Sequence, residues 1–585
     1  MKLEKDTIKG STAYIKGKQK DFENVKHELV FGNFTDPKMI IMRLFYLLIL
    51  SCFAISVTAQ DLPKSFLTTP ELSNYEKTST YADVMAFIDA VSKGTNKVSR
   101  ISMGTSLEGK DIPVLVLSNP KVSTPAEAKA SGKPIIYIQG NIHSGEVEGK
   151  EAVQVMLREI LHGDKGYLLD NQIILFAPIY NTDSNDKMEA GRRPSQEDSP
   201  KEVGIREASQ GWDLNRDGIK QEALETNGLI QNIIVPWDPT LFVDLHTTNG
   251  VWHGYSLTWA PSYHTAGEKA PYDFTWDRIL PEVTTQVKKK DDVYLGPYGY
   301  FYPQREGWPI KSITTYNHHP RYLVNQFGLR NRMAILSEAF AHERLYQRIN
   351  STHAFVREIL EFTNKNGKEM LKVNAQAEAA AIQLVKEQGG KVSKGVRFEM
   401  TALDKKIPAY RAYNYVAYDE TEGNRPGTRY VRKPEIVELP DVVNYSAFTP
   451  TVTAILPKGY IIPAEFANIA EHLMKNGVKV TKLEKNVRAT GQVYKATKLE
   501  LGQRPFEKHN MATIEGAYES ATKKFGKGDY WVDLAQPLAN LIFYMLEPES
   551  DDGLVTWNFF DEHFQKSGID QKAVEYPVFK YFELK

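Results

Sequence analysis

Cysteine is nearly absent from this chain of 585 residues, because the only one, Cys52, lies in an apolar run near the N-terminus. A chain that loses this run has no cysteine left, which excludes disulfides, thiol catalysis and cysteine-ligated zinc. Net charge is also lacking, since 72 Lys and Arg residues stand against 73 Asp and Glu residues. Such a chain has no general electrostatic attraction for nucleic acid or anionic membranes, and neither is expected as a partner.

Repeats and low-complexity segments are absent as well, and the content of 42% hydrophobic and 25% charged residues is typical of a globular protein. The length exceeds what one hydrophobic core supports, so more than one domain is expected. We predict an N-terminal extension with a signal peptide over 1–59, a catalytic α/β domain over 60–369 and a β-rich accessory domain over 370–585.

The apolar run 44–57 follows basic residues and ends in a small-x-small pattern at Ala59. Its 14 residues are too few for a stable membrane span, and they predict cleavage near Ala59 followed by secretion or release to the periplasm. Acylation of Cys52 as a lipoprotein is the alternative. Translation from Met39 or Met42 would remove the polar stretch ahead of the run. The mature chain is expected to have no membrane span.

Strand and helix patterns alternate from about residue 80 to residue 362, which predicts an α/β domain around a largely buried sheet. The apolar, β-branched runs that we read as strands are 113–118, 134–139, 172–178, 240–245 and 332–337. The amphipathic runs that we read as helices are 80–91 and 147–161. Beyond a helical stretch over 343–388, short Tyr-, Val- and Thr-rich runs separated by Gly and Pro indicate antiparallel strands, then a helix over 464–476 and a strand over 478–483.

Ionisable residues follow three of the apolar strands at their C-terminal ends. His143 and Glu146 follow the first of these strands, His246 follows the second and Glu338 ends the third. This edge of an open α/β sheet is where ligands bind. Two imidazoles and a carboxylate suit Zn2+ and leave a fourth position for water, while a carboxylate free of the metal can act as general base. Each residue alone is more often structural, and only their joint arrangement predicts the site.

The segment 211–217 carries the next group of candidates. Arg216 has a planar fork suited to a carboxylate, Asn215 adds hydrogen-bond donors, and Asp213 can accept a hydrogen bond from the second ring nitrogen of a ligand histidine. Arg192 and Arg193 are candidates to polarise a carbonyl and hold an oxyanion.

In this order, His143-x-x-Glu146, Asp213-x-Asn215-Arg216, His246 and Glu338 resemble the zinc metallocarboxypeptidases of the carboxypeptidase A type, and especially their secreted bacterial branch. The resemblance covers roughly residues 75–370. It implies an α/β/α fold with a mixed sheet of about eight strands.

The same resemblance implies a role for each matching residue. His143, Glu146 and His246 correspond to the ligands of one Zn2+ ion, and Glu338 corresponds to the general base. Asn215 and Arg216 correspond to the anchors of the substrate's terminal carboxylate, and Asp213 to the partner of the first histidine.

Three positions of the pattern depart from the family or stay open. Gly145 stands where digestive members carry an arginine. The arginine that holds the oxyanion falls on Arg192 or Arg193. The mobile active-site tyrosine falls on Tyr316, which we favour, or on Tyr322.

We therefore expect a secreted zinc carboxypeptidase that hydrolyses the last peptide bond of a peptide with a free C-terminus. A zinc amidohydrolase acting on peptidoglycan fragments or N-acyl amino acids would use the same ligands and is the alternative. A non-catalytic surface binding protein is the third hypothesis, and it would require a decayed metal site. The sequence does not fix the oligomeric state.

Overall fold

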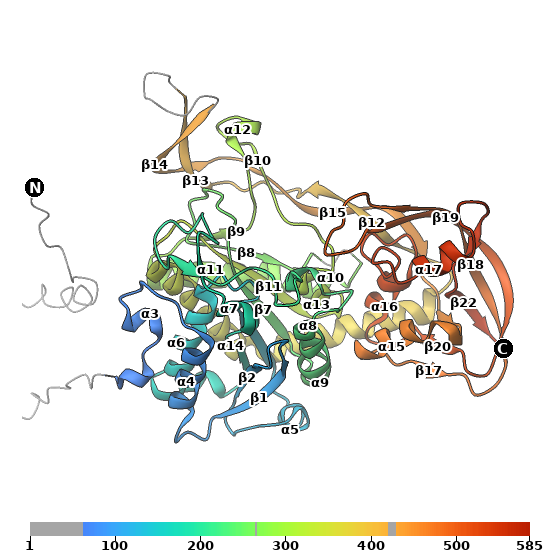
Figure 1. The fold of residues 1–585 in the computed structure, drawn as a ribbon, viewed down its shortest axis with the longest axis horizontal. Coiled ribbons are helices and arrows are strands. Elements are labelled where there is room, and N and C mark those ends of the chain that lie inside the picture. The colour runs from blue at the N-terminus through green and yellow to red at the C-terminus, as the bar shows by residue number, and fades with distance from the viewer. Residues whose placement is uncertain (1–61, 264–265, 419–428) are drawn as a thin grey trace, which may run out of the picture. The chain divides into compact units, whose positions relative to one another are not determined.

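Eight strands form one mixed sheet in the computed structural model, which describes residues 62–263, 266–418 and 429–585 (Figure 1). In spatial order the strands are β1 (Val98–Thr105), β2 (Asp111–Leu117), β4 (Ile173–Ala177), β3 (Ile135–Gly140), β7 (Leu241–Thr247), β11 (Met333–Ala339), β8 (Leu257–Pro261) and β9 (Leu295–Pro297). The four central strands β4, β3, β7 and β11 are parallel, and the strands next to them, β2 and β8, pair with them in the antiparallel sense. The prediction of a mixed sheet of about eight strands is confirmed.

Helices cover both faces of this sheet, because its strands are apolar on both sides. Along β3, Ile136 and Ile138 enter one core, whereas Ile135 and Tyr137 enter the core on the opposite face. The first core is closed by α4 (Tyr81–Ser92), α6 (Glu148–His162), α10 (Lys269–Phe274), α11 (Leu280–Asp291) and α14 (Leu345–Gln388). The second is closed by α5 (Pro125–Ser131), α9 (Val235–Trp237) and α13 (Leu323–Gly328). The three-layer α/β/α prediction is thereby confirmed.

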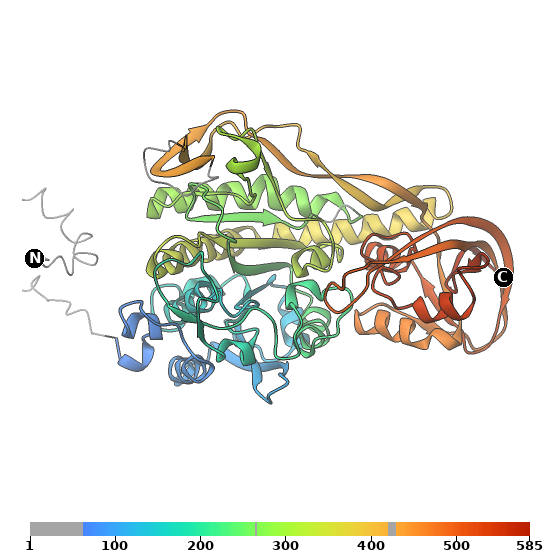
Figure 2. The same cartoon turned by 45° about the horizontal axis from the view of Figure 1, so that its top comes forward.

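The helix α14 links the sheet to the C-terminal part of the chain (Figure 2). Its first half packs on α6, and its last turns, with Ala381 and Val385, enter a separate core built by residues after 390. The helix is continuous over 44 residues and passes through the domain boundary that we predicted between 369 and 370. That boundary stays a prediction.

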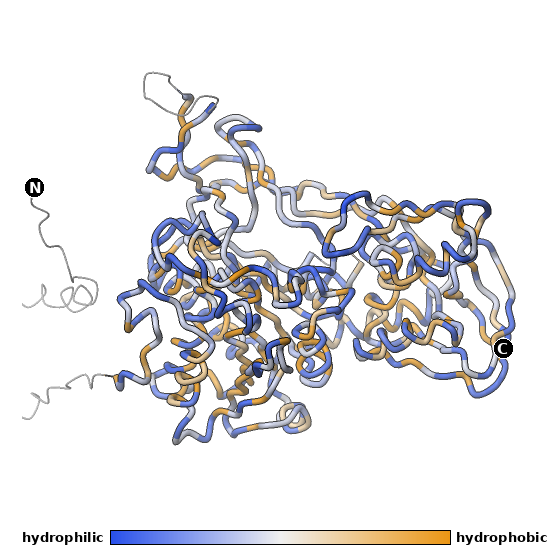
Figure 3. The backbone as a smooth tube through the Cα atoms, viewed as in Figure 1, coloured by the Kyte–Doolittle hydropathy of each residue, from blue (hydrophilic) through white to orange (hydrophobic). Residues whose placement is uncertain are grey.

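The C-terminal part is rich in antiparallel strands, as predicted. One sheet comprises β16 (Gly459–Ile462), β17 (Thr481–Lys482), β18 (Val487–Leu501), β19 (Ala512–Phe525), β20 (Tyr530–Asp533), β21 (Val574–Glu575) and β22 (Phe579–Leu584). It packs with α15 (Ala467–Lys475), α16 (Ala539–Leu546) and α17 (Asp561–Lys566). The strand predicted over 478–483 is reduced to β17. Hydrophobic stretches concentrate in the interior, in the central sheet and in α16 (Figure 3).

Two smaller sheets join the C-terminal part to the α/β part. β15 (Val443–Ile455) pairs with β12 (Ser393–Ala402) on one side and with β10 (Ser312–Thr314) on the other. β13 (Tyr410–Ala417) and β14 (Tyr430–Leu439) form a hairpin, and an isolated bridge joins Ala412 to His253.

The predicted signal peptide, its cleavage at Ala59 and the acylation of Cys52 lie outside the described residues. Among the helices of the described part, none is both long and apolar enough to cross a membrane.

Candidate active site

The register of the central sheet brings the predicted residues together. His246 on β7 and Glu338 on β11 are direct cross-strand partners, so their side chains emerge on the same face. β3, the neighbour of β7 on the other side, ends at Gly140, and His143 follows in the loop to α6. All three therefore lie at the carboxyl edge of parallel strands, as the sequence predicted.

Close packing of α6 on the sheet fixes the loop that carries His143 and Glu146. A Cβ atom added to Gly149, in the first turn of α6, would lie 2.7 Å from the Cβ atom of Leu245 on β7. Only glycine permits this approach. The first turn of α6 therefore sits directly on β7, beside His246.

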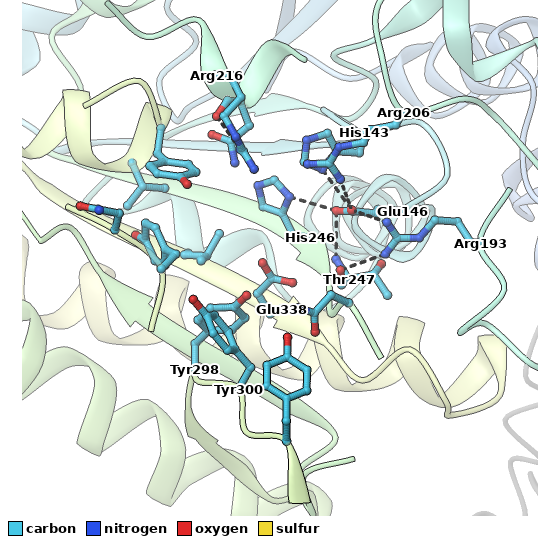
Figure 4. A pocket seen from close by; sticks show the side chains of 18 residues that line it. His143, Glu146, Arg193, Arg206, Arg216, His246, Thr247, Tyr298, Tyr300 and Glu338 are labelled. Carbon is cyan, nitrogen blue, oxygen red and sulfur yellow. Dashed lines mark hydrogen bonds and ion pairs between the residues drawn. The ribbon is translucent and has the colours of Figure 1, made fainter. Parts of the chain in front are cut away.

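Three side chains converge on one point at this edge (Figure 4). Oε1 of Glu146 lies 3.0 Å from Nδ1 of His143, and Oε2 lies 2.9 Å from Nδ1 of His246. The three side chains are buried, and one donor atom from each lies within 4.8 Å of the others. Two imidazole nitrogens and a carboxylate oxygen are a donor set that zinc prefers, so these residues fit a zinc ion.

Neighbouring carboxylates orient both histidines. Nε2 of His143 lies 3.0 Å from Oδ1 of Asp213. Nε2 of His246 lies 2.9 Å from Oδ2 of Asp244, at an angle that does not form a hydrogen bond. Such partners hold a ligand ring in place and leave its other nitrogen to face the metal. In both rings it is Nδ1 that faces Glu146.

Nearby positive charges keep the carboxylates of Glu146 and Asp213 ionised. Burial would raise the pKa of Glu146, but His143 and Arg193 outweigh it and hold that pKa well below its usual range. Burial also acts on Asp213, where His143 and the nearby arginines hold the pKa well below its usual range. An ionised Glu146 is the form that can ligate a cation.

Glu338 points toward His246 from the cavity wall (Figure 4). Within the described part of the chain, no hydrogen bond or ion pair engages its carboxylate, in contrast to Glu146. Removal from bulk water raises the pKa of Glu338 to about 8, although the positive charge of His246 works against this shift. A carboxylate that stands beside the donor set without being tied to it is placed to accept a proton.

A second trio, His318, His319 and Asp551, also has its ligand atoms close together. There, however, Oδ2 of Asp551 accepts a hydrogen bond from the backbone N–H of Phe398 and lies 3.2 Å from Nε2 of His318, while Oδ1 accepts from the hydroxyl of Tyr544. This carboxylate is occupied in joining chain segments, and we assign the metal to the first trio.

The structure separates the two adjacent arginines that the sequence left as alternatives. Arg193 lines the cavity, where its guanidinium donates to Oε1 of Glu146 at 2.9 Å and to the carbonyl of Thr247 at 3.1 Å. A Cβ atom on Gly145 would lie 2.8 Å from Cγ of Arg193, so the glycine makes room for this arginine. Arg192 points to the surface and pairs with Glu189, so an oxyanion role for Arg192 is withdrawn.

Arg206 is a cavity residue that the sequence did not reveal. Its Nη2 lies 2.9 Å from Oδ2 of Asp213, and its Nη1 lies 3.6 Å from Oε1 of Glu146. It follows an irregular segment with no periodicity, so no pattern marked it. With Arg193 it makes two guanidinium groups at the donor set.

Arg216 and Asn215 line the same cavity on the side of Asp213. The Arg216 guanidinium lies 4.5 Å from the centroid of the Tyr322 ring, and the side-chain oxygen of Asn215 accepts from the backbone N–H of Leu323 at 3.1 Å. Both side chains are thereby held in position facing the cavity.

Five tyrosines line the cavity, namely Tyr298, Tyr300, Tyr302, Tyr316 and Tyr322. Tyr316 packs against the rings of Tyr298 and Tyr322, and its hydroxyl donates to the carbonyl of Pro261 at 3.4 Å. Both tyrosines that the sequence offered as the active-site tyrosine, Tyr316 and Tyr322, therefore line the cavity, and the structure does not choose between them. The run Tyr298-Gly-Tyr-Phe-Tyr302 carried an alternation that would have indicated the other three.

A loop from the C-terminal part reaches the segment that carries Asp213. This loop, residues 502–511, joins β18 to β19. Oε2 of Glu507 accepts the backbone N–H of Asp213 at 2.9 Å, and Nζ of Lys508 donates to the carbonyl of Gln210 at 2.6 Å. These two hydrogen bonds hold in place the segment 210–213, which immediately precedes Asn215 and Arg216.

We expect Glu507→Ala to raise KM for a peptide about 10-fold while kcat changes little, because a hydrogen bond to a charged acceptor contributes roughly 1.5 kcal/mol. Steady-state kinetics with the two constants separated measures this. Glu507→Gln keeps an acceptor oxygen and should restore KM, and Arg504→Ala, on the same loop, is the matched control. If kcat of Glu507→Ala also fell about 10-fold, the loop would be stabilising the fold of the protein instead of positioning the substrate-binding residues.

Among the described residues the donor set offers three ligands, with an untied carboxylate beside them and guanidinium groups lining the same cavity, of about 470 Å³. A structural zinc site would be closed by a fourth protein ligand, whereas a catalytic site keeps a position for water or substrate. Fold and site together define a zinc metallopeptidase of the carboxypeptidase class.

Comparison with known proteins agrees with this class. Residues 84–273 match the zinc carboxypeptidase family. The match contains His143, Glu146 and His246, and Glu338 lies beyond its end.

Individual relatives are distant. Carboxypeptidase 2 of Trichophyton rubrum is 20% identical over 488 residues, which are 81% of either chain. Carboxypeptidase 2 of Trichophyton equinum is 21% identical over 467 residues, 77% of this chain and 78% of that one. Among solved structures, the putative carboxypeptidase A of Shewanella denitrificans OS-217 is 16% identical with a TM-score of 0.37, covering 49% of this chain and 69% of that one.

Proposed function

We propose that the protein removes the C-terminal residue of peptides with a free terminal carboxylate. This proposal rests on the position of Arg216, which lines the same cavity as the zinc donor set and Glu338. A planar guanidinium pairs with a carboxylate through two parallel hydrogen bonds, and Asn215 adds a donor beside it. A substrate held there presents its last peptide bond, and no other, to the donor set.

Each residue of the site then has a separate role in hydrolysis. His143, Glu146 and His246 would hold the zinc ion, which would supply Lewis-acid chemistry toward the carbonyl and water. Glu338 takes the proton of the attacking water and passes it to the leaving amine. Arg193 and Arg206 face the developing negative charge on the carbonyl oxygen. Asp213 and Asp244 keep the two imidazoles oriented.

The terminal side chain enters a part of the cavity that is apolar and uncharged. Val324 on α13 and Leu336 on β11 line it together with the tyrosines, and Leu336 points to the same face of the strand as Glu338. The carboxylates that line the cavity are Glu146 and Glu338. A basic terminal side chain would lack a partner here, so we propose apolar and aromatic C-terminal residues as the preferred ones.

We propose export for this protein, because the run 44–57 with its end at Ala59 has the features of a signal peptide. Acylation at Cys52 would retain the protein at a membrane instead. The proposal of a bacterial branch rests on sequence resemblance, while the Trichophyton relatives are fungal and the Shewanella structure is bacterial.

Metal analysis combined with a substrate panel tests the proposal. We expect one zinc per chain, loss of activity on chelation with recovery on added zinc, and release of Leu or Phe from free peptides with far slower hydrolysis of the same peptides with amidated ends. Hydrolysis of N-acyl amino acids or peptidoglycan fragments in preference to peptides would identify the amidohydrolase instead. A protein that binds zinc and cleaves none of these would contradict both.

A further inference from the structure

A second cavity, of about 330 Å³, adjoins the active site. Asn249 and Tyr302 line both cavities, so the two spaces are neighbours. The walls of the second are aromatic, with Trp252, Phe301 and Tyr415 added to Tyr302. Among the described residues that line it there is no carboxylate, and Arg305 is the one charged group. We call this cavity the aromatic groove.

Its walls are rigid before any ligand arrives. The ring of Trp252 is stacked between the imidazole of His342, at 3.4 Å between centroids, and the guanidinium of Arg432, at 3.2 Å from the centroid. Because both faces of this ring are covered, Trp252 serves as a fixed wall and offers only its edge. A preformed wall spares a ligand the cost of ordering it.

The wall that carries Phe301 and Tyr302 is hydrogen-bonded to the hairpin β13–β14 through Gln304. Gln304, in α12 (Pro303–Glu306), accepts the backbone N–H of Arg429 at 2.9 Å and that of Tyr430 at 3.1 Å. Tyr415 comes from β13 and packs on Trp308, with 5.1 Å between ring centroids. The groove is therefore built jointly by the α/β part and by residues after 390, outside the region that matches the zinc carboxypeptidase family.

The position of the groove relative to the zinc site suggests its occupant. Arg216 and Thr247 lie on opposite sides of His246 (Figure 4). Asn249 follows Thr247 by two residues and opens the groove, which places the groove on the side away from the carboxylate anchor. A peptide whose terminal carboxylate lies at Arg216 and whose last bond lies at the donor set must continue in this direction.

We propose that the aromatic groove binds the substrate residues that precede the scissile bond, and that it favours an apolar or aromatic side chain among them. This inference rests on the proposed function, because it uses the direction in which the substrate lies. The apolar walls supply the affinity, while the amide of Asn249 is a polar group beside the path of a peptide backbone. The C-terminal part of the chain thereby acquires a role in substrate selection.

Substrate length tests the proposal. N-acetylated peptides of two, three and five residues share the same last two residues, and the longer ones carry Phe or Leu further upstream. For wild type, kcat/KM should rise about 10-fold from two to five residues, since one well-packed aromatic contact is worth roughly 1.4 kcal/mol. Tyr415→Ala should abolish most of this rise and leave the acetylated dipeptide unaffected.

Two controls separate the groove from other effects. Tyr445→Ala removes a tyrosine that is 40% exposed on β15 and should preserve the full length dependence. Calorimetry on Glu338→Gln should show tighter binding of the pentapeptide than of the dipeptide, and Tyr415→Ala in that background should equalise the two.

Equal kcat/KM for all lengths in wild type would overturn the inference. An equal loss on dipeptide and pentapeptide in Tyr415→Ala would overturn it as well, because Tyr415 would then contribute to hydrolysis without contacting the upstream residues. Failure of wild type to cleave any of the acetylated peptides would instead contradict the proposed function, and the two failures are thus distinguishable.

Discussion

Glu338→Gln should lower kcat at least about 100-fold and leave the zinc content at one ion per chain, because a general base typically contributes 10²–10⁴-fold. Glutamine has nearly the shape of glutamate but cannot accept and return a proton. Glu338 lies beside the donor set but is not among the three convergent side chains, so its loss does not remove a ligand. Single-turnover kinetics and metal analysis on the same preparation measure the two quantities.

The pH profile gives an independent signature of the same residue. A general base acts only when ionised, so kcat/KM of wild type should rise with pH through the pKa of Glu338. Burial raises this pKa, and the neighbouring positive charge of His246, like that of a bound cation, lowers it. In Glu338→Gln the rising limb should disappear from the residual activity.

The control for this variant is Glu369→Gln, because Glu369 pairs with Arg278 on the surface of α14, away from the cavity. It should keep full activity and the wild-type pH profile. Loss of zinc in Glu338→Gln would assign this carboxylate to the metal and contradict the role of base. Retention of both zinc and full activity would contradict it too.

The sequence predicted the central part of this structure because local patterns and topology determine it. Strands apolar on both faces predict a covered parallel sheet, and residues that follow such strands must meet at one edge. His143, His246 and Glu338 are separated by about 100 residues each, yet the register between β7 and β11 makes two of them direct neighbours. The ligand set therefore followed from strand ends and residue chemistry.

What the sequence could not predict depends on contacts between irregular segments. Arg206 and Glu507 lie in loops, where no periodicity indicates which way a side chain points. The distinction between Arg192 and Arg193 depends on space left by Gly145, which comes from another segment. The aromatic groove needs β13, which follows the family-like region by more than 100 residues. Such long-range contacts leave no short-range pattern.

Arg216→Gln should lower kcat/KM for peptides with free ends by about 30-fold or more, because loss of one partner of a hydrogen-bonded charge pair in a desolvated site costs roughly 2–5 kcal/mol. Amidated peptides lack the carboxylate, so their slow turnover should change little. The ratio of the two rates, measured on paired peptides that differ only at this end, should therefore fall toward one.

The chain provides a matched control for the same substitution. Arg192→Gln also removes a guanidinium, but this arginine pairs with Glu189 at the surface and does not line the cavity. It should preserve the wild-type ratio. If Arg216→Gln slowed free and amidated peptides by the same factor, the guanidinium would be stabilising the site through Tyr322 rather than binding a terminal carboxylate, and the preference for chain ends would need another origin. Because a free carboxylate distinguishes a chain end from every internal bond, this ratio is the direct measure of whether the enzyme is an exopeptidase.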